Sequence, residues 1–104
     1  MVVDYSKTYI YSLEPITNIN KKLFILYSPE VERRWTSHKY CSTNSKAAEY
    51  NRRIYSFIRC NGGIENWTYK LLKFIPCKNR KEAELLLDLF IIDLRKNSEC
   101  TILN

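Results

Sequence analysis

The chain has 104 residues, 45% of them hydrophobic, which is enough apolar material for one hydrophobic core but not for two. Seventeen lysines and arginines against eleven acidic residues give a net charge of +6, so the charge favours a polyanion as the partner. No apolar run has the length of a signal peptide or of a membrane span. We therefore expect a single domain over residues 1–104, intracellular (cytoplasm or nucleus) and without a membrane partner.

Two strand-like segments open the chain. Residues 8–13 and 22–27 are rich in aromatic and β-branched side chains, which favour strands. Pro15, Asn18 and Asn20 lie between the two segments and are typical of turns. This pattern predicts an antiparallel hairpin with a longish loop.

A helix is predicted directly after the hairpin. Ser28 is a suitable N-cap, Pro29 suits the first helical position, and Glu30 complements the positive end of the helix dipole. Arg34 and His38, four residues apart, then share one helical face. A guanidinium beside an imidazole suits the binding of a phosphodiester and the stabilisation of charge as it is cleaved. The competing interpretation is an ordinary solvated polar face.

The second half of the chain predicts a helix, a strand and a last helix. Apolar residues recur at helical spacing over residues 50–58, before Asn61-Gly62-Gly63 ends that helix. Residues 67–75 read as a third strand, stopped by Pro76, and Asn79 with Glu82 resembles a capping box. The last helix is apolar nearly all round, so we expect it to be the most buried in the domain. The expected fold is α+β, a small three-stranded antiparallel sheet flanked by about three helices.

Asp88 interrupts the apolar run of the last helix. A carboxylate there is costly to desolvate unless it reaches water, a cation or a metal, which makes Asp88 a candidate site residue. Lys81, Glu84 and Arg95 fall roughly on the same stripe of the helix, however. In this second interpretation Asp88 only extends a polar face of the helix. The sequence leaves both interpretations open.

The order of these elements, together with four short motifs, resembles the GIY-YIG endonuclease family over most of the chain. Tyr9-Ile10-Tyr11 stands where the family has Gly-Ile-Tyr, and Phe24-Ile25-Leu26 stands where it has Tyr-Ile-Gly. Arg34-Trp35-x-x-His38 matches the helical motif of the family. Asp88-x-Phe90-x-Ile92 matches its acidic motif, and Asn104 lies at a suitable distance for its late asparagine.

The resemblance implies a role for each matched residue. Tyr11 would help to activate water as a general base, His38 would orient or assist that tyrosine, and Arg34 would bind the scissile phosphate. Asp88 would hold a single Mg²⁺ or Mn²⁺ ion opposite the leaving oxygen. Asn104 would steady the site from the chain end.

Several positions depart from the family pattern. Tyr9 and Leu26 replace both glycines, and Phe24, at the degenerate second-motif position, replaces a tyrosine and loses its hydroxyl. Tyr27 carries a hydroxyl next to this motif, but neighbouring strand residues face opposite sides of a sheet. Asp88 is one methylene shorter than the usual glutamate.

The favoured function is a metal-dependent endonuclease that hydrolyses phosphodiester bonds in DNA or structured nucleic acid. The alternative is a catalytically inactive module that binds nucleic acid or a protein partner, and a third is a small domain of unrelated function. The chain has no room for an appended DNA-binding domain, which favours low specificity, a homodimer or a protein partner, and by family analogy suits a virus or mobile element. The nucleic acid, for which DNA is favoured, would contact a set of basic residues: Lys21, Lys22, Arg33, Lys39, Arg52, Arg53 and Arg59.

Overall fold

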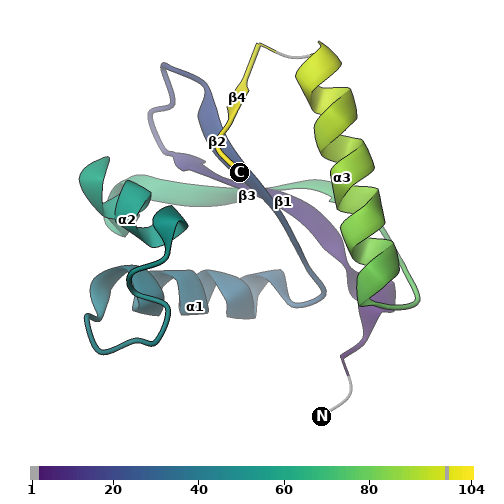
Figure 1. Ribbon diagram of the computed structural model, residues 1–104, viewed down its shortest axis with the longest axis horizontal. Coiled ribbons are helices and arrows are strands. Elements are labelled where there is room, and N and C mark those ends of the chain that lie inside the picture. The colour runs from purple at the N-terminus through teal and green to yellow at the C-terminus, as the bar shows by residue number, and fades with distance from the viewer. Residues whose placement is uncertain (1–2, 98) are drawn as a thin grey trace.

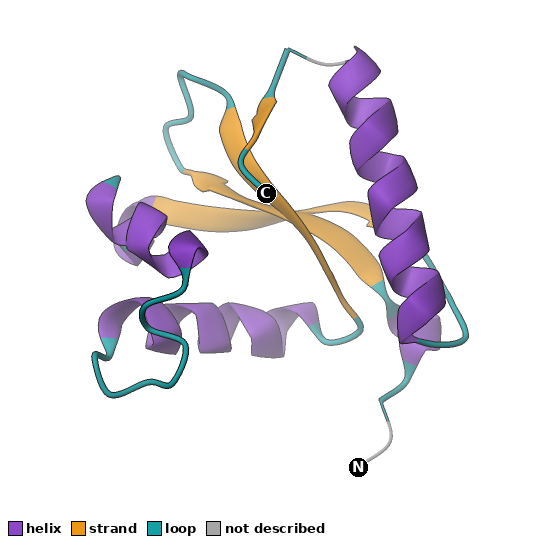
Figure 2. Ribbon diagram, viewed as in Figure 1, coloured by secondary structure: helices purple, strands orange, loops and turns teal. Residues whose placement is uncertain are grey.

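The computed structural model describes residues 3–97 and 99–104, so residues 1–2 and 98 of the expected domain lie outside the described part. The α+β class is confirmed: one sheet, in the strand order β3-β1-β2-β4, is flanked by three α-helices (Figures 1 and 2). The strands are β1 (Tyr9–Pro15), β2 (Lys22–Ser28), β3 (Trp67–Phe74) and β4 (Thr101–Ile102). The helices are α1 (Val31–Thr43), α2 (Arg53–Cys60) and α3 (Arg80–Asn97), with short 3₁₀ turns at Tyr5–Lys7 and Ile64–Asn66.

The expected three-stranded sheet gains a fourth strand. β1 pairs antiparallel with β2 and with β3, as predicted, whereas β4 pairs parallel with β2 through Lys22 and Leu23 only. A two-residue strand has too few positions to show an alternating pattern, which is why the sequence did not predict it. The register between β1 and β3 shifts between Ile10 and Tyr11.

Helices cover both faces of the sheet. α1 and α2 pack on one face over a cluster of buried side chains: Tyr11, Leu13, Phe24, Val31, Cys41, Tyr55, Ile58, Ile64 and Trp67. α3 packs on the other face over a second cluster: Ile10, Leu23, Ile25, Ile75 and Ile91. The alternation of Ile10 and Tyr11, and of Phe24 and Ile25, between the two clusters follows from the two-residue period of a strand.

The helix α1 begins two residues later than the sequence predicted. It starts at Val31, and its Glu30 N-cap position has no side-chain capping bond. The hydroxyl of Ser28 instead accepts a hydrogen bond from the Glu30 amide at 2.9 Å. Ser28 and Pro29 therefore form the turn that leads into α1, rather than its cap and first residue.

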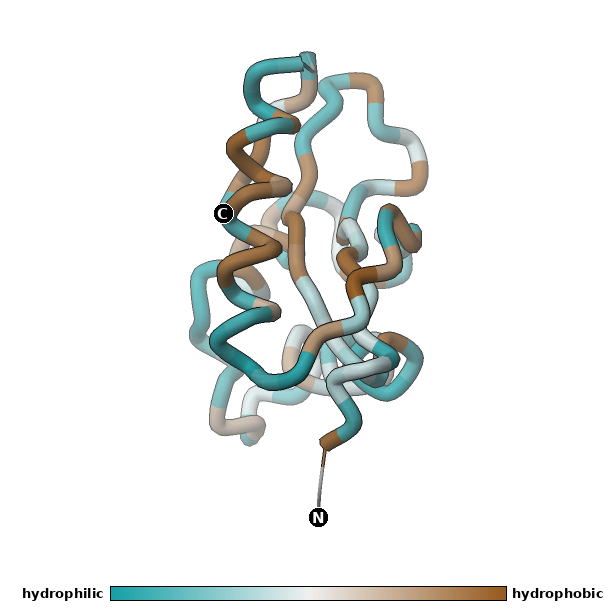
Figure 3. The backbone as a smooth tube through the Cα atoms, turned by 90° about the vertical axis from the view of Figure 1, so that its right-hand side faces the viewer, coloured by the Kyte–Doolittle hydropathy of each residue, from teal (hydrophilic) through white to brown (hydrophobic). Residues whose placement is uncertain are grey.

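The prediction that the last helix is the most buried is wrong. Among the described side chains of α3 only Ala83 and Ile91 are buried, whereas Leu85 is 58% exposed and Leu89 53% exposed. One side of α3 packs on the sheet, while Leu85, Leu89 and Ile92 remain exposed. Figure 3 shows hydrophobic residues along the length of this helix. None of the described helices is both long and apolar enough to cross a membrane.

The outer edge of β2 is only partly covered by β4. β4 pairs with Lys22 and Leu23, and the chain end continues with a hydrogen bond from the Leu103 amide to the Leu23 carbonyl. Leu26, Tyr27 and Ser28 lie beyond this pairing and line a cavity between α1 and α3. The open half of β2 is thus where helices from both faces of the sheet come together.

Candidate functional site

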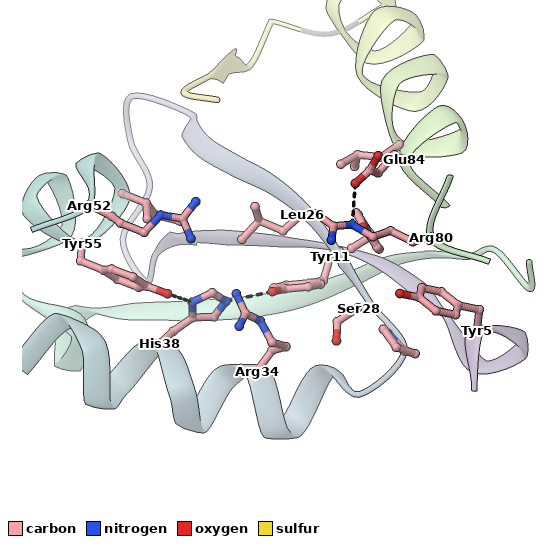
Figure 4. A pocket seen from close by; sticks show the side chains of 14 residues that line it. Tyr5, Tyr11, Leu26, Ser28, Arg34, His38, Arg52, Tyr55, Arg80 and Glu84 are labelled. Carbon is pink, nitrogen blue, oxygen red and sulfur yellow. Dashed lines mark hydrogen bonds and ion pairs between the residues drawn. The ribbon is translucent and has the colours of Figure 1, made fainter. Parts of the chain in front are cut away.

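A cavity of about 460 Å³ opens at this uncovered edge of β2. Side chains from β1, β2, all three helices and the segments before α2 and β1 line it (Figure 4). Its residues with titratable or charged groups are Tyr5, Tyr11, Tyr27, Arg34, His38, Arg52, Tyr55, Arg80 and Glu84. The cavity therefore collects polar chemistry from parts of the chain that are far apart in sequence.

Tyr11, His38 and Tyr55 form a hydrogen-bonded chain along one wall of the cavity (Figure 4). The Tyr11 hydroxyl lies 2.8 Å from His38 Nε2, and the Tyr55 hydroxyl lies 2.9 Å from His38 Nδ1. All three side chains are about 1% exposed. Strand β1, helix α1 and helix α2 each supply one of these side chains, so the packing of three elements fixes the two hydrogen bonds.

Burial sets the protonation states of these three side chains. Burial raises the pKa of Tyr11 to about 12, against the lowering effect of the charge and N–H donors of Arg34. Burial also raises the pKa of Tyr55 to about 12. Burial, followed by the positive charges of Arg34 and Arg52, lowers the pKa of His38 to about 4. At neutral pH all three groups are therefore uncharged.

Three arginines surround the cavity. Arg34 extends from α1 beside Tyr11 and His38, Arg52 stands at the N-cap of α2, and Arg80 begins α3 (Figure 4). Arg34 is half-buried, and the other two are exposed. Three guanidinium groups around one small opening make it a strong site for an anion with several oxygens, such as a phosphate.

Glu84 is the carboxylate that reaches the cavity. Its Oε1 accepts a hydrogen bond from Arg80 Nε at 2.9 Å within an exposed ion pair. Tyr27 lines the same side, and its pKa is raised by burial and then by the charge of Glu84. Tyr27 thus lines the cavity, and its hydroxyl is a hydrogen-bond partner of Arg80. An ion pair this exposed is weak, so the Glu84 carboxylate can exchange Arg80 for another cation.

The structure brings together Tyr11, Arg34 and His38, but not the other residues that the resemblance placed with them. Asp88 is exposed on α3 and does not line the cavity. Phe24 is buried in the core, with its ring centroid 5.7 Å from that of Phe57. The side chain of Asn104 pairs with the backbone N–H and C=O of Ile25, so it closes the edge of β2 outside the cavity.

The basic residues expected to contact nucleic acid fall into two groups. Arg59 has a structural role, because it donates to the carbonyls of Ser42 and Tyr50 and stacks 3.6 Å from the Tyr50 ring centroid. This half-buried guanidinium is engaged in joining α1, α2 and the loop between them, which removes it from the expected set. The others are exposed at the surface: Lys21, Lys22, Arg33, Lys39, Arg52 and Arg53.

Tyr55, Arg80 and Glu84 line the cavity and were missed by sequence reasoning. Tyr55 was not among the residues singled out in the second helix, because the sequence of a helix gives no sign of where a tyrosine hydroxyl ends. Glu84 was grouped with the solvated stripe of the last helix. It lies four residues before Asp88, so the two share a helical stripe but stand one turn apart along it. The distance of each acid from the edge of β2 was the missing information.

Comparison of the chain with protein-family models, curated proteins and solved structures gives no match. The function is therefore argued from the residues and geometry of the cavity.

Proposed function

We propose that this protein is a metal-dependent endonuclease that resembles the GIY-YIG family and hydrolyses phosphodiester bonds in DNA or structured nucleic acid. The observation that carries the proposal is the convergence of Tyr11, Arg34 and His38 in one cavity that also contains the carboxylate of Glu84. The sequence alone predicts the first three of these residues as members of one site. A base, a phosphate ligand and an acidic residue are the groups that such a reaction requires.

Arg34 is suited to hold the scissile phosphate. Its guanidinium lies beside the Tyr11 hydroxyl, so a phosphate bound to it would stand next to the group that activates water (Figure 4). Arg52 and Arg80 flank Arg34 at the rim of the cavity and are suited to the neighbouring phosphates of the same strand. Positive charge around the phosphate also stabilises the charge that develops on its equatorial oxygens.

Tyr11 and His38 together provide a route for the proton of the attacking water. Tyr11 accepts a proton from water as it passes its own proton to His38 Nε2, across the 2.8 Å contact. The water oxygen then attacks phosphorus, and the bond from phosphorus to the leaving oxygen breaks. Burial is the main cause of the low pKa of His38, and Arg34 and Arg52 depress it further, so a bound phosphate that offsets their charge would remove that second part and make the imidazole a better base.

The proposed reaction uses a divalent cation, and Glu84 is the carboxylate of the cavity that would hold it. No group of three or more potential ligands among His, Cys, Asp and Glu occurs in the described residues, so a complete protein cage for a metal is not formed there. Mg²⁺ and Mn²⁺ are commonly held by one or two carboxylates with water and substrate phosphate, and Glu84 supplies such a carboxylate. We assign this role to Glu84 rather than Asp88. The bound ion would act as a Lewis acid at the leaving oxygen.

Cleavage of supercoiled plasmid and of branched DNA with Mg²⁺ or Mn²⁺ tests the proposal. Arg34→Ala is expected to lower the cleavage rate by about 100-fold or more, because it removes charge stabilisation at the phosphate. Arg95→Ala removes the same charge from an exposed position in the last turn of α3, outside the expected nucleic-acid contacts, and is expected to cleave almost as fast as the wild type. DNA binding without cleavage under either metal would instead identify an inactive binding module.

A further inference from the structure

Tyr55 matches no motif of the GIY-YIG family, yet its hydroxyl is hydrogen-bonded to His38, the only histidine of the sequence. It extends from α2 to His38 Nδ1 at 2.9 Å, on the opposite side of the imidazole from Tyr11 (Figure 4). The Tyr55 ring is packed in the core formed by α1, α2 and the sheet. A buried hydroxyl held in this way has a fixed relation to the imidazole.

A neutral imidazole between two hydroxyl groups has two hydrogen-bonding arrangements. One nitrogen carries the proton and donates, and the other accepts, so one tyrosine must donate to His38 while the other accepts from it. Proton transfer from Tyr11 requires that Nε2 is the accepting nitrogen. The proton of the imidazole must then be on Nδ1, and Tyr55 must accept it.

Arg34, which lies next to Tyr11 at the other end of this series of hydrogen bonds, favours the same arrangement. Its N–H donors and positive charge act on the Tyr11 oxygen, which therefore serves as an acceptor towards Arg34. The Tyr11 proton is then directed to His38 Nε2 at 2.8 Å. Nδ1 of the same neutral ring must carry the remaining proton, and the Tyr55 oxygen is the acceptor within reach.

We propose that Tyr55 is a positioning residue that holds His38 as the Nδ1–H tautomer, leaving Nε2 free to take the proton of Tyr11. When His38 receives that proton, both of its N–H groups have oxygen acceptors, Tyr11 on one side and Tyr55 on the other. The proposal for the tautomer stands on the two hydrogen bonds of His38 and on the contact of Arg34 with Tyr11. Its catalytic consequence rests on the proposed nuclease function.

The tautomer can be measured directly because the chain has a single histidine. Long-range ¹H–¹⁵N spectra of ¹⁵N-labelled protein at neutral pH will show one imidazole, for which we expect the Nδ1–H pattern. Tyr55→Phe keeps the ring in the core but removes the acceptor, so it is expected to shift the population towards Nε2–H. Tyr40→Phe, at a position of α1 that is 54% exposed, is the matched control and is expected to leave the spectrum unchanged. An Nε2–H wild type, or no change in Tyr55→Phe, would overturn the proposal.

Cleavage kinetics then separate positioning from simple loss of structure. Tyr55→Phe is expected to lower kcat by about 100-fold, the scale of one general-base contribution, with KM unchanged. A rise in KM with unchanged kcat would overturn the positioning role, because it would place the effect in binding. If the wild type does not cleave nucleic acid at all, the proposed function fails, while the tautomer spectrum still decides the role of Tyr55 on the imidazole.

Discussion

At the scale of single residues, His38 shows what the spacing of residues in a helix predicts and what it does not. The spacing of four residues predicts that Arg34 and His38 share a helical face, and both do line one cavity. Glu30, which lies four residues before Arg34 along the chain, pairs with Arg33 at 3.5 Å. The burial of His38 between Tyr11 and Tyr55 depends on contacts with β1 and α2, which no pattern within α1 contains.

The buried, neutral state of His38 predicts a dependence of stability on pH. Its folded-state pKa of about 4 lies below the ordinary value of 6.5, so the unfolded chain takes up the proton first as the pH falls. This contribution to the free energy of unfolding is complete above about pH 6.5 and is lost as the pH falls to about 4. The shift corresponds to about 3 kcal/mol.

Chemical denaturation between pH 7 and pH 4 measures this loss. His38→Gln is the control, because it keeps a polar side chain at the position but has no group that titrates in this range. The free energy of unfolding of the wild type should fall by about 3 kcal/mol more than that of the variant. Parallel pH profiles for the two proteins would mean that His38 is not buried in its neutral form.

At the scale of the elements, the strands and helices follow from local patterns, while the burial of α3 does not. The run of apolar residues in this helix was read as complete burial, but the sheet covers only one side of it. Whether a second layer exists outside a helix is a property of the whole fold. The two-residue strand β4 likewise has no pattern of its own in the sequence and forms only because it pairs with β2.

Substitutions on the two sides of α3 should therefore differ in their cost. Ile91→Ala creates a cavity in the core beneath the helix and is expected to lower the free energy of unfolding by about 3 kcal/mol. Leu85→Gln, at a position that is 58% exposed, is expected to change it by less than about 0.5 kcal/mol. Thermal or urea denaturation measures both. Equal losses would show that the outward side of α3 is covered in solution.

At the scale of the whole molecule, the site exists because the sheet has an incompletely covered edge. α1 and α2 reach it from one face and α3 from the other, so residues 11, 34, 55 and 84 meet there. The sequence order of the elements indicated the fold class correctly. It did not indicate which residues of α2 and α3 would face the same edge, because that depends on the twist and packing of the complete domain.

The proposed function predicts which basic residues would contact nucleic acid. Arg52, at the rim of the cavity, is expected to neutralise one phosphate, so Arg52→Ala should reduce the slope of log affinity against log salt by about one. Lys96→Ala removes the same charge at the far end of α3, about 18 Å along the helix from Glu84, and should leave the slope unchanged. Titration of labelled DNA at several salt concentrations measures both slopes. Equal effects of the two substitutions would indicate binding by overall charge only.

The most direct measurement compares cleavage by Glu84→Gln and by Asp88→Asn with Mg²⁺ or Mn²⁺. Both substitutions remove one carboxylate charge from α3, but only Glu84 lines the cavity. We expect Glu84→Gln to lose cleavage by about 100-fold or more while it keeps its fold, and Asp88→Asn to cleave like the wild type. Retained cleavage in Glu84→Gln, or loss of it in Asp88→Asn, would contradict an active site at the open edge of β2.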